Sequence, residues 1–215
     1  MNQSSSGILL LLSIAVGVAM IGLGIIWPLI PVYAVELGAG GFLVGLIIAS
    51  FNVSRTILNP IVGRISDRLG RKKFIVAGLF AYGTIAVFYV LPTHAELLVL
   101  IRFFHGLASV FVVPIAMALA ADIAPKQKLG LYMGTLNMAV MLGLGIGPVL
   151  GGTIRDHFGV DAAFYAMSVL AFLTCLLVLI FIPADEQTRG SRESQHIYSI
   201  RKMLAHRVVL GIFIM

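Results

Sequence analysis

Two short series of polar residues interrupt stretches of the sequence that are otherwise apolar. Each series has the spacing i, i+3 and i+7, which places its members on one face of a helix. The series are Asn52, Arg55 and Asn59, and Arg102, His105 and Ser109. A guanidinium group donates hydrogen bonds and attracts anions, and a histidine titrates near neutral pH. These residue types are candidates for carrying protons or contacting a polar solute, and Asn137 is a further polar candidate.

Each candidate also has a structural explanation. A charge inside a membrane span costs about 2.5–3.5 kcal/mol on insertion scales, so Arg55 and Arg102 require water or buried partners. Arg102 lies roughly 9 Å inside its apolar stretch at the helical rise per residue, a depth from which its side chain can snorkel to the interface. His105 and Asn137 can each make a single structural hydrogen bond. These alternatives stay open at this point.

The elements that must position these residues are membrane-spanning helices. The chain is 60% hydrophobic and 11% charged, with a mean hydropathy of +1.04, whereas soluble domains are about half apolar and a quarter charged. A helix needs about 20 apolar residues to cross the hydrocarbon core. Six such spans are predicted, at about 7–35, 42–62, 74–93, 96–121, 130–152 and 162–183. Only one cysteine, Cys175, is present, which rules out a disulfide within the chain.

The distribution of cations predicts how these spans are oriented. Five of the fifteen Lys and Arg residues fall in the stretch 63–73, two in 122–128 and five in 185–207, whereas the alternate connections hold only Arg155. Lys and Arg accumulate on the cytoplasmic side of a membrane. The N-terminus is therefore expected in the cytoplasm, in a multi-pass protein of the plasma (inner) membrane. The net charge of +6 is explained by this topology, and we expect no nucleic-acid partner.

A repeated pattern predicts the internal organisation of the bundle. The pattern Gly-x3-Asp-x2-Gly occurs at Gly63, Asp67 and Gly70 and again at Gly152, Asp156 and Gly159. The copies follow the second and fifth predicted spans, so three spans separate them and they face opposite sides of the membrane. This arrangement is typical of an inverted repeat. We expect an all-α bundle at 1–184 with repeats at about 1–95 and 96–184, a cytoplasmic linker at 185–207, and the start of a truncated seventh span at 208–215.

Three motifs resemble those of the major facilitator superfamily, and the resemblance covers one six-helix half. The stretch "GRISDRLGRKK" resembles the superfamily's signature between spans two and three through Gly63, Asp67, Arg68, Gly70, Arg71 and Lys72. "RFFHG" resembles the span-four pattern through Arg102 and Gly106, with His105 where the pattern has glutamine. The fifth span resembles the antiporter-branch pattern through Gly134, Gly143, Gly147, Pro148, Gly151 and Gly152.

The resemblance implies the N-terminal bundle of a twelve-helix transporter that works by alternating access. It implies that the first motif is a latch in which Asp122 can pair with Arg71, against the alternative that the cations only set topology. Small residues at 143, 147 and 151 share one helical face and allow close packing, and the resemblance adds a role in exchange. Arg102 would bias proton affinity, although many proton-driven relatives also hold a carboxylate within a span and this sequence has none.

The function expected from these features is proton-coupled efflux of drug-like or amphiphilic small molecules. The alternatives are a sugar or metabolite carrier of the same superfamily, a half-size membrane protein that regulates a partner transporter, and an intramembrane enzyme. No nucleophile–base arrangement, phosphate-binding loop or zinc-protease motif is found in the sequence, so we expect no enzyme, cofactor or metal. The expected partners are the substrate, protons, the lipid bilayer, and either a C-terminal half or a second copy.

Overall fold

A computed structural model describes residues 5–182 of the chain, and these residues form helices and their connections. The helices are α1 (Ser5–Glu36), α2 (Gly41–Leu69), α3 (Arg71–Phe88), α4 (Glu96–Val110), α5 (Val113–Ile123), the short 3-10 helix η1 (Lys126–Lys128), α6 (Leu129–Phe158) and α7 (Val160–Phe181). The predicted linker at 185–207 and the predicted seventh span at 208–215 lie outside the described residues.

The fourth predicted span is one membrane crossing built from two helices, α4 and α5. The break at Phe111 and Val112 has a local cause, because Pro114 has no backbone N–H to continue the helical ladder. The backbone N–H groups of Phe111 and Val112 instead donate to the carbonyls of Ala108 and Ser109, at 3.1 and 3.3 Å, in the tighter pattern of a 3-10 turn. The predicted boundaries of this span, 96–121, therefore contain a discontinuity that the prediction missed.

Two of the predicted interhelical loops are almost entirely helical. The stretch 63–69 forms the last turns of α2, and the stretch 152–158 forms the last turns of α6. In each case a single glycine, Gly70 or Gly159, connects to the next helix with a φ of +103° or +88°. This left-handed region costs a residue with a Cβ and suits glycine. The prediction of a loop over 63–73 was wrong, because the turn needs only one residue.

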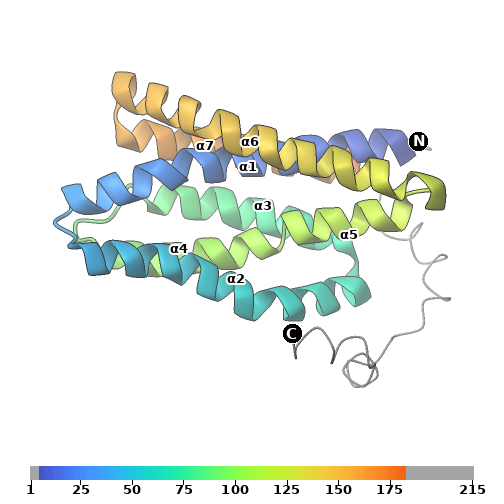
Figure 1. Ribbon diagram of the computed structural model, residues 1–215, viewed down its shortest axis with the longest axis horizontal. Helices are drawn as coiled ribbons and strands as arrows, with labels where there is room; N and C mark the ends of the chain where they lie inside the picture. Colours follow the sequence, from blue (N-terminus) through green and yellow to red (C-terminus); the bar gives the residue numbers. More distant parts are fainter. Residues whose placement is uncertain (1–4, 183–215) are drawn as a thin grey trace, which may run out of the picture. The chain divides into compact units, whose positions relative to one another are not determined.

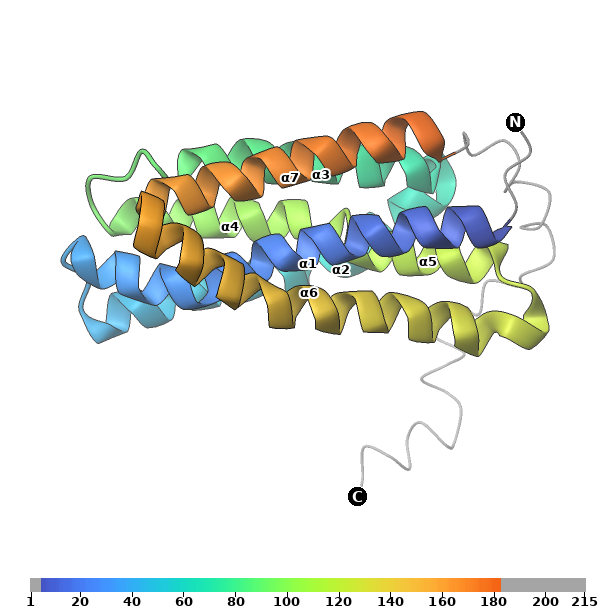
Figure 2. The same ribbon diagram turned by 90° about the horizontal axis from the view of Figure 1, so that it is seen from above.

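The pairing of helices supports the inverted repeat. The helix α1 packs along α6, α2 packs along α4, and α3 packs along α7 (Figure 1 and Figure 2). When the first three spans are exchanged with the last three, the pair α1–α6 maps onto the pair formed by α2 and α4–α5, and α3–α7 maps onto itself. The two glycine turns lie at opposite ends of the bundle (Figure 1).

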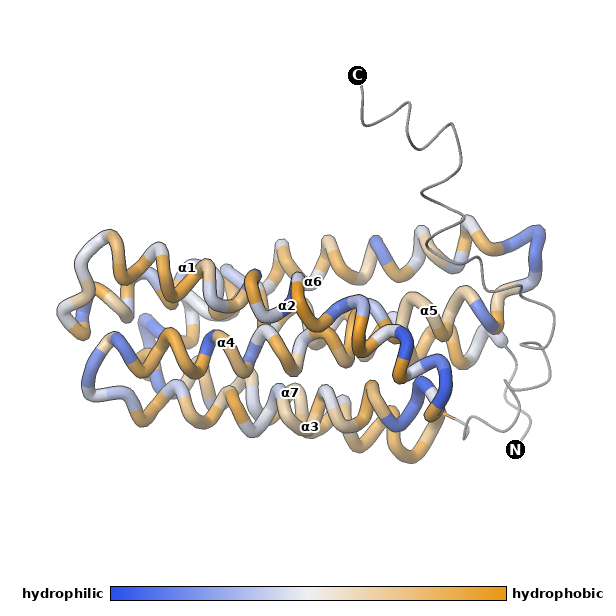
Figure 3. The backbone as a smooth tube through the Cα atoms, turned by 90° about the horizontal axis from the view of Figure 1, so that it is seen from below, coloured by the Kyte–Doolittle hydropathy of each residue, from blue (hydrophilic) through white to orange (hydrophobic). Residues whose placement is uncertain are grey.

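Five segments within residues 5–182 are long and apolar enough to cross a membrane, namely α1, α2, α4–α5, α6 with η1, and α7. The helix α3 has 18 residues and begins with three cations, Arg71, Lys72 and Lys73, which keep it outside that set. Figure 3 shows that hydrophilic segments gather mainly near helix ends. The core includes Leu12, Val16, Leu79, Ile115 and Val178, contributed by α1, α3, α5 and α7.

Candidate functional site

The polar residues of α4 turn inward, into the six-span bundle. Arg102 is 1% exposed, His105 is fully buried and Ser109 is buried. The alternative in which Arg102 snorkels to the interface is therefore wrong for this structure. Among residues 5–182, no hydrogen-bond partner is present for Nε and Nη1 of Arg102 or for Nε2 of His105. The structure thus places an unneutralised guanidinium in the interior of the bundle.

Aromatic rings from two neighbouring helices surround this pair. The guanidinium carbon of Arg102 lies 4.6 Å from the ring centroid of Phe51 on α2, which is a cation–π contact. The Tyr89 hydroxyl at the end of α3 lies 3.0 Å from Nδ1 of His105, and the Tyr82 ring packs edge-on against the imidazole at 4.2 Å. Sequence analysis missed Phe51, Tyr82 and Tyr89. The spacing of seven between the tyrosines was the available signal, because it places both on one face of α3.

The polar residues of α2 point mostly away from the core. Asn52 and Asn59 are exposed and Arg55 is partly buried. The guanidinium carbon of Arg55 lies 5.4 Å from the Phe51 ring centroid, so Phe51 connects Arg55 to the buried cluster. Asn137 is exposed on α6. The structure therefore brings Arg55, Arg102 and His105 around one ring and leaves Asn52 and Asn137 on outward faces.

The first motif forms an ion-pair cluster at one end of the bundle. Arg71, the first residue of α3, places Nη2 3.0 Å from Oδ1 of Asp67 and 3.1 Å from Oδ2 of Asp122 on α5. The Arg71 side chain is only 10% exposed, which distinguishes this cluster from an exposed ion pair of small energetic value. The contact expected between Arg71 and Asp122 is present, and it ties the α2–α3 turn to the end of the fourth span.

The other members of the first motif have separate surroundings. Lys72 donates from Nζ to the carbonyl oxygen of Leu179 at 2.8 Å, close to the end of α7, and Arg68 is exposed. Gly70 supplies the turn through its positive φ. Gly63 lies within α2, and a Cβ added there would have no neighbour within 4 Å. The expectation that Gly63 is needed for the turn or for close approach was wrong.

The fifth-span motif packs α6 tightly against α1. A Cβ on Gly143 would lie 2.6 Å from the carbonyl oxygen of Gly17, and a Cβ on Gly147 would lie 2.6 Å from Cα of Gly24. Gly151 faces Ile25 in the same seam, at 3.0 Å from its Cα. The predicted face of small residues is therefore a close helix contact. Gly134 and Gly152 have open space around them and take no part in it, and Pro148 lies within the continuous helix α6.

An ion pair that sequence analysis missed lies at the opposite end of the bundle. Arg155 on α6 donates from Nη2 to Oε1 of Glu36, the last residue of α1, at 2.8 Å. Both side chains are substantially exposed, at 34% and 50%. Under the inverted repeat, the end of α1 corresponds to the end of α5. Glu36 at the end of α1 pairs with Arg155 near one glycine turn, as Asp122 at the end of α5 pairs with Arg71 near the other.

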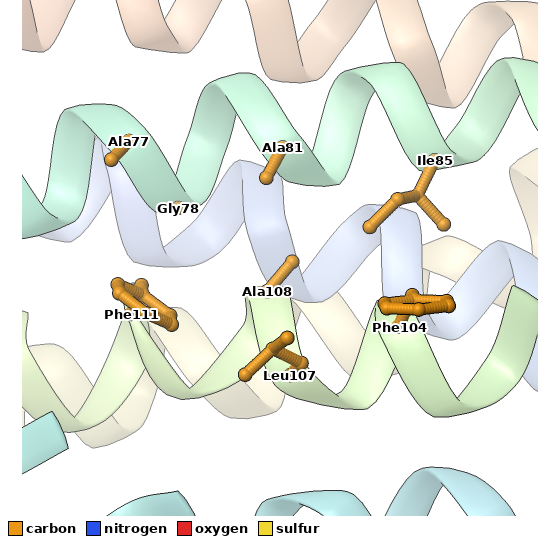
Figure 4. A pocket seen from close by; sticks show the side chains of 8 residues that line it. All are labelled: Ala77, Gly78, Ala81, Ile85, Phe104, Leu107, Ala108 and Phe111. Carbon is orange, nitrogen blue, oxygen red and sulfur yellow. The ribbon is translucent and has the colours of Figure 1, made fainter. Parts of the chain in front are cut away.

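An apolar groove of about 310 Å³ lies between α3 and α4 and is separate from the polar cluster. On the α3 side it is lined by Ala77, Gly78, Ala81 and Ile85, and on the other side by Phe104, Leu107, Ala108 and Phe111 (Figure 4). The lining contains no candidate site residue. The polar chemistry of the described residues therefore lies in the cluster of Arg55, Arg102 and His105 around Phe51, and in the ion pairs at the two ends of the bundle.

Comparisons with known proteins agree with this architecture. The family model described as Major Facilitator Superfamily matches residues 12–215. An MFS-type transporter of Methanocaldococcus jannaschii is 41% identical over 158 residues, covering 74% of this chain and 41% of that protein. Multidrug resistance protein 2 of Bacillus subtilis is 31% identical over 175 residues (81% and 43%). Quinolone resistance protein NorA of Staphylococcus aureus is 31% identical over 173 residues (79% and 44%).

A solved structure shares the fold. The human organic anion transporter MFSD10 superposes with a TM-score of 0.72 at 18% sequence identity, over 85% of this chain and 49% of that one. At this identity the likeness concerns the fold alone. The chain spans less than half the length of the curated relatives it matches, at 41–44% of their sequences.

Proposed function

This chain belongs to the major facilitator superfamily, and from that premise we propose that the full-length protein exports drug-like or amphiphilic small molecules in exchange for protons. The observation that carries the proposal is the similarity to two resistance transporters across about four fifths of the chain. The protein is a membrane transporter by family. Its substrate class, its coupling to protons and its location in the plasma (inner) membrane with a cytoplasmic N-terminus are the proposed parts.

The exposed faces of α2 and α6 support a partner bundle. Of the residues in the most apolar windows of these two spans, 22% and 17% are buried, compared with 39–50% in the three other spans. Their outward faces carry Asn52, Arg55 and Asn137, which are costly to expose to hydrocarbon. We propose that these faces meet a second six-helix bundle and an aqueous pathway between the bundles, supplied by a C-terminal half or by a second copy.

The ion pairs at the two ends support alternating access. The buried pair of Arg71 and Asp122 joins α3 to α5 at one end of the bundle, and the exposed pair of Arg155 and Glu36 joins α6 to α1 at the other. In the proposal, the Arg71 cluster is a latch that stabilises one access state and opens in the other. In the proposal, α1 and α6 move together, because their backbones are in close contact along Gly143, Gly147 and Gly151.

The test is a proton-release assay with the full-length protein. Everted membrane vesicles are energised and a pH-sensitive dye is followed while lipophilic cations, neutral drugs and amphiphilic acids are added one at a time. Wild-type protein is expected to release protons on addition of at least one compound. Arg102→Ala is expected to abolish the release, and Lys126→Ala, which removes an exposed cation, is expected to retain it. The absence of a response to every compound, with correctly inserted protein, contradicts the proposal.

A further inference from the structure

The interior of the described bundle carries positive charge without a carboxylate. All six acidic residues in the range 5–182 lie at or near helix ends, namely Glu36, Asp67, Glu96, Asp122, Asp156 and Asp161. The charged residues away from helix ends are Arg55, in the middle of α2, and Arg102, in α4. Because charges attract and repel strongly where water is scarce, this interior is electrostatically suited to an anion and unsuited to a cation.

Phe51 concentrates the two guanidinium groups in one place. Arg102 lies 4.6 Å and Arg55 lies 5.4 Å from the centroid of its ring, and the His105 ring meets the same ring edge-on at 5.6 Å. The π face of a phenylalanine stabilises a guanidinium, but the N–H groups of that guanidinium remain free to donate hydrogen bonds. In the described part of the chain, Nε and Nη1 of Arg102 have no hydrogen-bond partner although both are buried. The described cluster therefore lacks a counter-charge, and two of the three guanidinium nitrogens of Arg102 lack an acceptor.

Arg55 is the accessible member of this cluster. Arg102 and His105 are sealed inside the bundle, whereas Arg55 is only partly buried and follows the exposed Asn52 on the outward face of α2. Asn59, two turns after Asn52, is exposed on the same helix. A face with two amides and a guanidinium at the middle of a span is too polar to contact lipid tails. A solute in the aqueous pathway of the proposed transporter would meet Arg55 there.

We propose that Arg55, supported by Phe51 and by the charge of Arg102, binds the carboxylate of a transported amphiphile. The inference rests on the proposed function and narrows its substrate class to molecules that carry an anionic group. A guanidinium presents parallel N–H donors that match the two oxygens of a carboxylate. The same charges repel a cationic amphiphile, so the site selects by attraction and by repulsion together.

The test compares three pyrene amphiphiles that differ in charge. Pyrenebutyrate, its methyl ester and a pyrenylalkyl trimethylammonium salt share one apolar group, and their binding to the full-length protein in nanodiscs is measured by equilibrium dialysis against empty nanodiscs. We expect the acid to bind at least about tenfold more tightly than the ester, a ratio that a single well-formed charged contact supplies. The cation is expected to bind more weakly than the ester.

Variants of α2 assign the preference to Arg55. Arg55→Gln is expected to lower the ratio of the affinities for acid and ester to near one. Arg55→Lys keeps the charge but loses the pair of parallel N–H donors, and it is expected to give an intermediate ratio. Arg64→Gln removes an exposed cation of the same helix and is expected to leave the ratio unchanged. Size-exclusion chromatography of each variant checks that it is folded. If Arg55→Gln is misfolded, the affinity ratio of Arg55→Lys is compared with that of the wild-type protein instead.

Several outcomes overturn the inference. They are equal affinities of wild-type protein for acid and ester, a preference that survives in Arg55→Gln, an equal loss in Arg64→Gln, and binding of the cation as tight as that of the acid. The last result would mean that the positive charge of these arginines is neutralised in the full-length protein. Transport into vesicles separates the two proposals. Equal export of acid and ester supports the proposed transport function and refutes the carboxylate site. Binding that depends on Arg55 but is not followed by export supports the carboxylate site and refutes the proposed transport function.

Discussion

Replacing Gly147 by alanine tests whether the α1–α6 seam is as close as the structure places it. A Cβ at this position would lie 2.6 Å from both the Ile21 carbonyl oxygen and Cα of Gly24, whereas ordinary contacts begin at 3.4 Å. The deficit of about 0.8 Å is against backbone atoms, which cannot rotate away. The two helices must therefore separate, and overpacking of this kind costs about 1–3 kcal/mol.

Gly145 is the matched control because it belongs to the same helix and has open space around it. Alanine there removes the helix-weakening entropy of glycine, worth up to about 1 kcal/mol. Both substitutions gain this term, so it cancels in their comparison, and Gly147→Ala should be less stable than Gly145→Ala by the overpacking cost of about 1–3 kcal/mol. The assay is the midpoint of thermal unfolding of the full-length protein in detergent. Equal midpoints for Gly147→Ala and Gly145→Ala, or a larger loss for Gly145→Ala, refute the close seam.

Two further substitutions test the α2–α3 turn and its ion pairs. Gly70→Ala places a Cβ on a residue with a φ of +103°, which we expect to cost about 1–2 kcal/mol of unfolding free energy. Gly63→Ala, on an open helix surface, should not destabilise the protein. Equal effects of the two substitutions on the midpoint of thermal unfolding contradict this expectation. Asp122→Asn removes one of the two carboxylates of the mostly buried Arg71 and should cost about 1–3 kcal/mol. Asp156→Asn, on the exposed end of α6, should change the midpoint little, and a comparable fall in both variants argues against the cluster.

The membrane class, the number of crossings and the repeat were predictable because they depend on local or periodic features. Hydropathy counts apolar residues along the chain, and the repeated Gly-x3-Asp-x2-Gly pattern marks two equivalent turns wherever the helices pack. The pair of Arg71 and Asp122 was also predictable, since Arg71 begins one span and Asp122 ends another, and both lie next to stretches rich in cations. The expected loop at 63–73 failed because composition does not report how few residues a glycine turn requires.

The spacing of the two series of polar residues did not predict which way each series faces. The same i, i+3 and i+7 pattern turns inward on α4, where Arg102 is 1% exposed, and mostly outward on α2, where Asn52 and Asn59 are exposed. A helical period defines a face but not the direction in which that face points. The direction follows from which neighbouring helices offer a surface, and α4 is covered by both α2 and α3.

The sequence alone determined the class of protein, since apolar spans, biased cations and three spaced motifs are properties of residue type and order. Only the tertiary structure decided which side chains meet. Phe51 meets Arg102 and His105 because the tight approach at Gly106 brings α4 against the Phe51 carbonyl and the Ser54 hydroxyl of α2, whereas Arg55 lies one turn after Phe51 on α2 itself. Glu36 and Arg155 pair across 119 positions of sequence. Such contacts arise from the rotation and register of packed helices, which depend on the fit of all six spans at once.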